Sequence, residues 1–370
     1  MHATRALLVL ALPLLLSACN PPSPPAQSTI EILADDYLAA MMKQDPLMGT
    51  YYSIAGARHD HLPDNSLAAL ADWAAQEDAF LARLNAIEPP TEVGSRDWVS
   101  YGLLKEQLEA SVDYRVCRDE LWQAAAATSW HTELPFVFDV QPLGTPDLHQ
   151  QALSRLGEVA GYIDNEIANL SLGLELGYSA PRVTVNAVPT QIRALIGEDS
   201  IFLGPARRSD DPAFAAAVVA LYEEQIAPAL TRYADFIEQE YIPQARDTLS
   251  VTANPNGEQC YPARIRFFVT KAVPADEIQA LGRQQVAHIR NEMRITLDAH
   301  FGGGDITAFL RHINEEPAYT FVTEDDVLQY SVYGLVAAKA AMPEAFGVLP
   351  KADVLVKPYP EFAESGSGEY

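Results

Sequence analysis

The longest regular pattern in the sequence is a stripe of apolar residues that recur every three or four positions after Thr145-Pro146. Such spacing places side chains on one face of an α-helix, because the helix turns once in about 3.6 residues. Thr145 can cap the first turn, and proline suits the first helical position because its missing N–H would be unpaired there anyway. The pattern predicts a long helix with one buried face. The stripe comprises Leu148, Ala152, Leu156, Val159, Ile163, Ile167, Leu170 and Leu174.

Helical spacing also dominates the rest of the chain. Ser28 and Glu31 fit a capping box, and the helix that follows is expected to end near Asp45-Pro46. Pro228 lies inside another long stripe and should kink or divide that helix. One further helix is predicted over residues 64–87, and the stripe that contains Pro228 runs from 219 to 241. Other helices are predicted to begin at the cap Ser95, at Pro274 and at the cap Thr323.

Strand signals are short and weak by comparison. They lie chiefly at Arg264–Thr270 and Val354–Lys357. Apolar residues make up 48% of the chain, which is enough for a substantial core. The sequence therefore predicts a mainly α fold, a multi-helix, bundle-like array with at most a few short strands, in a helical domain over residues 29–370.

The N-terminus has the features of an exported lipoprotein. Arg5 gives a positive start, residues 6–16 are almost wholly apolar, and Leu16-Ser17-Ala18-Cys19 fits a lipobox. We interpret residues 1–18 as a signal peptide, Cys19 as the lipidated residue, and residues 19–28, rich in proline and serine, as a tether. The alternative is an ordinary signal peptide with a cysteine nearby by chance.

The expected location follows from this signal. Asn20, rather than an aspartate, follows Cys19, so retention in the inner membrane is not signalled. We expect the lipid to attach the protein to the outer membrane of the bacterial cell envelope, facing the periplasm. No later segment is expected to cross a membrane.

Acidic residues outnumber basic ones by 50 to 25, which gives a formal net charge of −25. Such a surface repels phosphate backbones, so nucleic-acid binding is not expected. Solubility explains this charge more simply than a specific cationic partner does. The charge is compatible with a peptide or a small-molecule ligand.

Two cysteines remain in the chain after Cys19. An oxidising compartment permits a disulfide between Cys117 and Cys260, and no other cysteine is left to pair with either. The alternative is two buried free thiols, because a disulfide needs a geometry that sequence does not specify.

Local motifs for catalysis are absent from the sequence, which has no HExxH segment, no glycine-rich phosphate loop and no nucleophile elbow. His288 and Glu292 lie one helical turn apart and could supply two metal ligands, but the missing third ligand favours an ordinary helical pair. Three glycines, 302–304, before Asp305 favour a helix-ending turn, and His131 in an expected loop favours an ordinary structural histidine. We therefore predict no catalytic, cofactor-binding or metal-binding residue in this chain.

Several segments resemble a bacterial family known as domain of unknown function 885. The longest is Gly173–Arg182, which is followed by Val185, Val188 and Gln191. Shorter ones are Asn256–Tyr261, Phe346–Pro350, and Asp45-Pro46 with Gly49-Thr50. The resemblance runs from about residue 30 to Tyr370. The alternative is an unrelated helical lipoprotein.

The resemblance implies a zinc-peptidase-like protein in a family with many lipoproteins. The family's hallmark is a His-Glu-x-x-Pro-Gly-His-His segment in its C-terminal part, where the histidines hold zinc and the glutamate activates a water. No segment here matches that hallmark, so the resemblance covers the N-terminal portion only. It transfers no metal or catalytic residue, and zinc is expected only with the missing C-terminal part.

Two further interpretations depend on the resemblance. In a complete protein, Ala180-Pro181-Arg182 could touch substrate; the alternative is a proline that ends a helix and an arginine in a salt bridge. The segment Glu364–Tyr370 is interpreted as a point of truncation, and the alternative is a flexible natural C-terminus.

The expected function combines these observations. We predict a membrane-anchored lipoprotein that resembles the N-terminal portion of a zinc-metallopeptidase-like protein and is inactive alone. The alternative is a non-catalytic periplasmic binding or scaffold lipoprotein. The metal content and the reading frame beyond Tyr370 distinguish the two.

Overall fold

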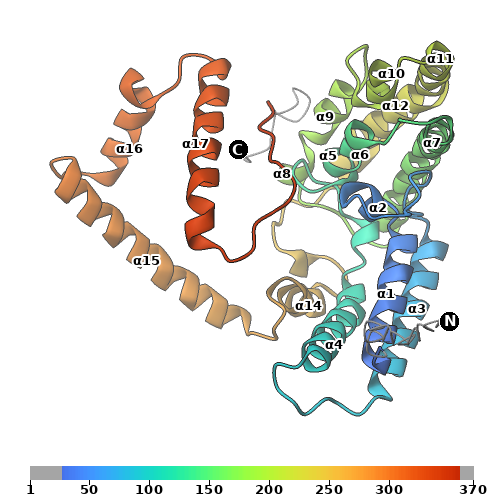
Figure 1. The fold of residues 1–370 in the computed structure, drawn as a ribbon, viewed down its shortest axis with the longest axis horizontal. Helices are drawn as coiled ribbons and strands as arrows, with labels where there is room; N and C mark the ends of the chain where they lie inside the picture. Colours follow the sequence, from blue (N-terminus) through green and yellow to red (C-terminus); the bar gives the residue numbers. More distant parts are fainter. Residues whose placement is uncertain (1–26, 359–370) are drawn as a thin grey trace, which may run out of the picture.

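A computed structural model describes residues 27–358 of the chain (Figure 1). Cys19, the signal peptide, most of the tether and the segment Glu364–Tyr370 lie outside these residues. Over 27–358 the chain forms helices joined by turns and loops, with one isolated parallel bridge between Pro181 and Arg246. The predicted mainly α fold is confirmed.

The N-terminal helices pack as a small bundle of α1 (Thr29–Gln44), α3 (Leu67–Asn85) and α4 (Arg96–Tyr114). The predicted capping box at Ser28 and the cap at Ser95 are both present. Helix α3 begins after the cap Ser66, rather than at Asp64. The bundle has its own apolar core, made of Ile30, Leu33, Tyr37, Leu84, Tyr101, Leu104 and Leu108.

The long predicted helix after Thr145 is α7 (Pro146–Glu175), and the Thr145 side chain accepts a hydrogen bond from the backbone N–H of Leu148. Its apolar stripe is buried against α11 (Pro212–Leu221) and α12 (Ala227–Phe236), and α9 (Val188–Ala194) packs on α12 to complete the largest core of the described chain. Shorter helices surround this core: α2 (Leu47–Tyr51), α5 (Trp130–Glu133), α6 (Phe136–Val140), α8 (Arg182–Val185), α10 (Gly204–Arg208) and α13 (Ile242–Gln244).

The stripe from 219 to 241 is divided as expected near Pro228. The helix widens into π-turns at Tyr222–Ile226 and Ile237–Tyr241, and Pro228 lies in the first turn of α12 between them. By length and composition, Pro212–Gln244 could cross a membrane, which we did not expect of any later segment. Tyr233, Leu230 and Tyr241 are fully buried in the core, so the packing of this stretch accounts for its apolar character.

The predicted strand Arg264–Thr270 is wrong, because most of this segment forms the second half of α14 (Gly257–Val269). The helix packs against α4, where Arg266 pairs with Glu106, Glu109 and Asp113 on one face of α4. The second predicted strand, Val354–Lys357, has no strand partner either in the described part of the chain.

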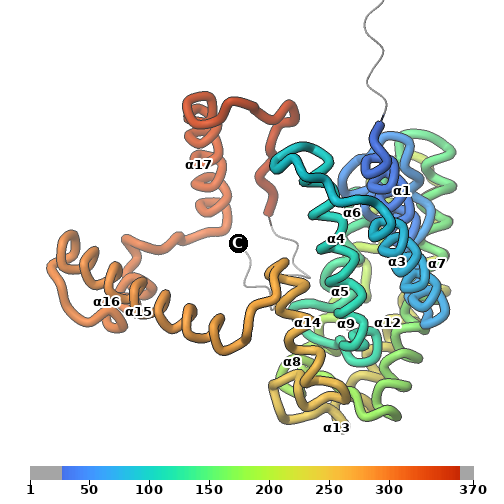
Figure 2. Tube along the Cα trace, turned by 90° about the horizontal axis from the view of Figure 1, so that it is seen from below, coloured from blue at the N-terminus to red at the C-terminus, as the bar shows by residue number. Residues whose placement is uncertain are grey.

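The last three long helices stand apart from this body in both views (Figures 1 and 2). They are α15 (Ala275–His300), α16 (Ile306–Glu315) and α17 (Glu324–Ala345), which we call the C-terminal arm. Leu297 is the one buried residue among the residues of these helices. Many large apolar side chains of the arm are exposed, among them Leu281, Val286, Ile289, Ile295, Leu310, Val327, Tyr330, Tyr333 and Val336.

Candidate functional site

A groove with a volume of about 680 Å³ opens on the body beside α14. Its walls come from residues 122–128, 180–184, 246–251 and 261–278. Because Trp122 lines it and is held by its neighbours, we call it the Trp122 groove. It is the candidate site because it combines an aromatic ring, two arginines and exposed apolar side chains.

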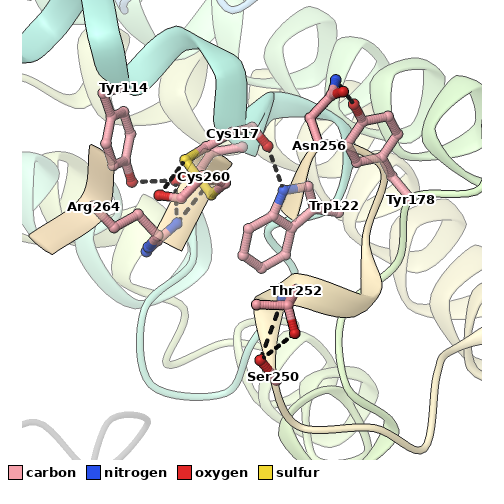
Figure 3. The surroundings of a disulfide bond; sticks show 10 residues. Tyr114, Cys117, Trp122, Tyr178, Ser250, Thr252, Asn256, Cys260 and Arg264 are labelled. Atoms are coloured by element: carbon pink, nitrogen blue, oxygen red, sulfur yellow. Dashed lines mark hydrogen bonds and ion pairs between the residues drawn. A yellow bond between two sulfur atoms is a disulfide. The ribbon is translucent and has the colours of Figure 1, made fainter. Parts of the chain in front are cut away.

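A disulfide between Cys117 and Cys260 supports one wall of the groove (Figure 3). Cys117 ends a 3-10 turn after α4, and Cys260 lies near the start of α14. Both are buried, and their Cα atoms are 4.7 Å apart. Of the two alternatives left open by the sequence, the structure contains the bridge rather than the free thiols.

The ring of Trp122 is fixed from several sides. Its Nε1 donates to the carbonyl of Cys117 at 2.9 Å, and the guanidinium groups of Arg246 and Arg264 lie 5.4 and 5.5 Å from the ring centroid. Such cation–π contacts stabilise an aromatic side chain in one orientation. The groove therefore has a rigid aromatic element before any ligand binds.

The two arginines differ in their charge partners. Arg264 donates to both oxygens of Asp119 at 2.8 Å, so its charge is compensated. Arg246 donates from Nε to the carbonyl of Thr248 and from Nη1 to Oδ1 of Asn254, and it has no ion pair within residues 27–358. Partial burial lowers the pKa of Arg246. The groove thus contains one uncompensated positive charge on an acidic protein.

The rest of the lining is largely apolar. Pro181, Val251 and Ile265 line the groove together with two strongly exposed side chains, Leu249 at 70% and Phe268 at 67%. Exposed apolar side chains around a hollow are typical of a ligand site, because a ligand can remove them from water.

The segments that carry the family resemblance also build this part of the fold. A Cβ atom at Gly173 would lie 1.7 Å from the carbonyl oxygen of Leu121, and one at Gly257 would lie 2.2 Å from that of Val251. Only glycine permits these two backbone approaches. Gly173–Arg182 and Asn256–Tyr261 are therefore constrained by the way the chain packs around Trp122.

The structure places the three residues of the candidate substrate contact Ala180-Pro181-Arg182 in different surroundings. Ala180 and Pro181 line the groove. The Arg182 guanidinium instead donates to the carbonyls of Ile242 and Ala245 and pairs with Asp247. Arg182 thus stabilises the C-terminal end of α13 through hydrogen bonds and an ion pair, in agreement with the salt-bridge alternative.

The other residues singled out from the sequence lie elsewhere. His131 is in α5 rather than in a loop, is 3% exposed, and its Nε2 is 2.9 Å from Oε1 of Gln191. Burial lowers the pKa of His131 to about 4, so the ring is neutral at physiological pH. Gly302–Gly304 have positive φ and end α15 before Asp305, which caps α16.

His288 and Glu292 are both exposed on α15. Over residues 27–358, no cluster of three or more histidine, cysteine, aspartate or glutamate residues is arranged to hold a metal ion. The pair therefore has no third protein ligand close by in the described chain.

A second hollow, of about 870 Å³, lies between the end of α1, residues 54–65 and α7. Behind it, Arg155 is fully buried and donates to Thr50, Gln141 and the carbonyl of His61. On the rim Arg58 pairs with Asp60 and His61 with Glu158, whereas Lys43 makes no ion pair within residues 27–358. We call it the polar hollow.

Apart from Ala180 and Pro181, sequence reasoning missed the residues of both hollows. Arg155 follows Ala152 by three positions and so lies on the buried face of α7, which is a detectable signal for a buried, hydrogen-bonded charge. Trp122, Arg246 and Phe268 offer no such local signal, because the groove is assembled from segments far apart in the sequence.

Comparison of the sequence with known protein families identifies the family of this chain. The family described as "Bacterial protein of unknown function (DUF885)" matches residues 46–370. The chain belongs to this family. No curated protein is significantly similar to it in sequence.

Two solved structures share the fold of this DUF885 protein. One, a "putative lipoprotein" from Colwellia psychrerythraea, is 19% identical with a TM-score of 0.77, over 92% of this chain and 64% of that one. The other, a "putative lipoprotein of unknown function" from Shewanella oneidensis, is 15% identical with a TM-score of 0.58, over 90% and 61%. The chain thus spans less than two thirds of the length of either neighbour.

The disulfide should contribute strongly to stability. It closes a sequence separation of 143 residues, for which chain entropy alone corresponds to roughly 5 kcal/mol. Replacing Cys117 and Cys260 together by serine should lower the free energy of unfolding by about 2–5 kcal/mol in urea titrations. Wild-type protein in reductant is the matched control and should unfold like the double variant; an unchanged midpoint in reductant would contradict the prediction.

Glu166 of α7 should make stability fall as pH rises. Burial raises its pKa from 4.5 to about 7, partly opposed by a hydrogen bond from Asn65. The folded chain then holds this proton where the unfolded chain has lost it, so the stabilisation is full below pH 4.5 and is lost as pH rises through about 7. Between pH 5 and 8, the urea midpoint of Glu166→Gln should fall less than that of the wild type. Parallel curves of urea midpoint against pH for the two proteins would refute this.

Proposed function

We propose that the protein is a bacterial envelope lipoprotein, anchored through Cys19 to the outer membrane, whose helical body binds a peptide or small molecule in the Trp122 groove. The observation that carries the binding role is the combination of exposed apolar side chains with the uncompensated charge of Arg246. The lipobox at Leu16–Cys19 supports the anchor. The descriptions of the two structural neighbours agree with an envelope location.

We also propose that this chain corresponds to the N-terminal portion of a zinc-peptidase-like protein and does not hydrolyse peptides by itself. The sequence lacks the family's histidine-rich hallmark, and the described residues do not supply a set of zinc ligands. We therefore assign no catalytic step to this chain.

The C-terminal arm supports the same proposal. Its helices expose apolar side chains such as Val286, Ile289 and Tyr330. Contact of so many apolar side chains with water is unfavourable, which is typical of a surface that another part of a protein covers. Both neighbours have at least a third of their length without a counterpart here. We propose that the arm is the surface on which a corresponding part of the family's fold packs.

A non-catalytic binding lipoprotein is the second candidate. The groove is lined by residues between Trp122 and Ile278, so only the first turns of α15 in the arm contribute to it. The two candidates share the groove and differ in whether a zinc centre is supplied by additional polypeptide.

Lipid attachment predicts a clear fractionation result. Cys19→Ala should release the protein from the membrane fraction and abolish incorporation of labelled palmitate, because the thiol is the acylated group. Asn20→Ala is the matched control and should remain in the membrane fraction with its label. If Cys19→Ala fractionates with membranes as wild type does, the anchor is wrong.

Metal analysis tests the absence of a zinc centre. The purified chain, after dialysis with zinc and then buffer, should retain well under one zinc per chain in elemental analysis. The reason is that the described residues lack a suitable ligand cluster. One tightly held zinc per chain would overturn this prediction, and His288→Ala would then test whether the α15 pair holds it.

A further inference from the structure

We infer that the Trp122 groove selects ligands that join an apolar or aromatic body to a carboxylate, as the C-terminal end of a peptide or a small aromatic acid does. This inference rests on the proposed binding role and names its ligand class. The chemistry follows from three features of the groove: one free guanidinium, an apolar wall and the absence of a competing unpaired acid.

The guanidinium of Arg246 is positioned to receive an anion. Its Nε and Nη1 are engaged by the carbonyl of Thr248 and Oδ1 of Asn254, whereas its Nη2 makes no hydrogen bond within residues 27–358. These two bonds and the contact with the Trp122 ring hold the group in place. An arginine held in this way binds a carboxylate with little further loss of side-chain entropy.

The surroundings of Arg246 strengthen this preference. The side chain is half-buried, and burial lowers its pKa because the charged form loses solvation. A carboxylate from the ligand would restore a charge partner in a site of reduced dielectric, where the attraction exceeds that in water. Asp119, the acid paired with Arg264, is already neutralised and does not compete.

The apolar wall requires a second feature of the ligand. Leu249, Val269 and Phe268 are exposed by 70%, 47% and 67%, and all three line the groove. A hydrophilic anion such as acetate would leave them in water, whereas an aromatic or aliphatic body would cover them. The ligand must therefore carry both parts within a space of about 680 Å³.

The polar hollow does not share this chemistry. Its rim contains the pairs Arg58–Asp60 and His61–Glu158 and the exposed Lys43, which is unpaired within residues 27–358, and Arg155 lies behind the hollow rather than in its lining. An anion could approach Lys43 there, but none of the residues that line this hollow is among the strongly exposed large apolar side chains. The combination of an uncompensated arginine with an exposed apolar wall is thus specific to the groove among these two hollows.

Matched acids and amides test the ligand class directly. The whole chain with Cys19→Ala would be titrated calorimetrically with N-acetyl-alanyl-phenylalanine, its C-terminal amide, N-acetyl-alanyl-alanine and 3-phenylpropionate. The phenylalanine acid should bind at least tenfold more tightly than its amide, and more tightly than the alanine acid. Binding of 3-phenylpropionate at equal strength would assign the ligand to small aromatic acids, and its failure would assign it to peptide C-termini.

Variants locate the effect in the groove. Arg246→Gln should weaken the acid about tenfold without changing the affinity for the amide, and Phe268→Ala should weaken both. Arg232→Gln, an exposed arginine of α12 that pairs with Asp164, is the matched control and should change neither. Because Arg246 also supports Asn254, urea midpoints would be compared, and Arg246→Lys should retain part of the preference.

The outcomes separate the two proposals. If the acid and the amide bind equally to a groove that Phe268→Ala weakens, the carboxylate preference is wrong while the binding role stands. If Phe268→Ala affects no compound, the groove is not the binding site and both proposals fail. The comparison of the acid with its amide uses the chain in which Arg246 is unchanged. It therefore tests the carboxylate preference even if the Arg246 variants do not fold.

Discussion

The burial of one face of α7 is the interaction on which the rest of the structure depends. Leu156, Val159 and Ile163 are almost wholly removed from water and form the floor of the largest core. The same helix carries Arg155 under the polar hollow at one end and Gly173 against Leu121 near the other. One buried helix therefore fixes the backbone positions beneath both hollows.

The groove depends on covalent and electrostatic restraints added to this core. The disulfide joins the end of the N-terminal bundle to the start of α14, and Arg266 joins the other end of α14 to acidic residues of α4. These links hold α14 beside the segment that carries Trp122. The opposite wall is held by the backbone bridge between Pro181 and Arg246. A rigid groove is the consequence, and rigidity reduces the entropy lost when a ligand binds.

The charge distribution gives this rigid groove its chemical character. The chain has a formal charge of −25, and most arginines of the body are paired with carboxylates. Arg246 differs because its partners are neutral oxygens. The C-terminal arm differs in another way, since its apolar side chains lack a covering partner in the described chain. The two surfaces that we propose for ligand recognition and for packing of further polypeptide meet at the start of α15, where Ile278 lines the groove.

The sequence by itself determined the helices, because caps such as Ser28 and Thr145 and the spacing of apolar residues act within a few turns. It also determined the acidic surface and the lipobox, whose signals are local or compositional. Local patterns failed at Arg264–Thr270, most of which belongs to α14 and packs against α4. Only the tertiary structure decided the Trp122 groove and whether Cys117 and Cys260 are bonded, because both require residues more than a hundred positions apart to meet. No short window of sequence records which segments a buried core will bring together.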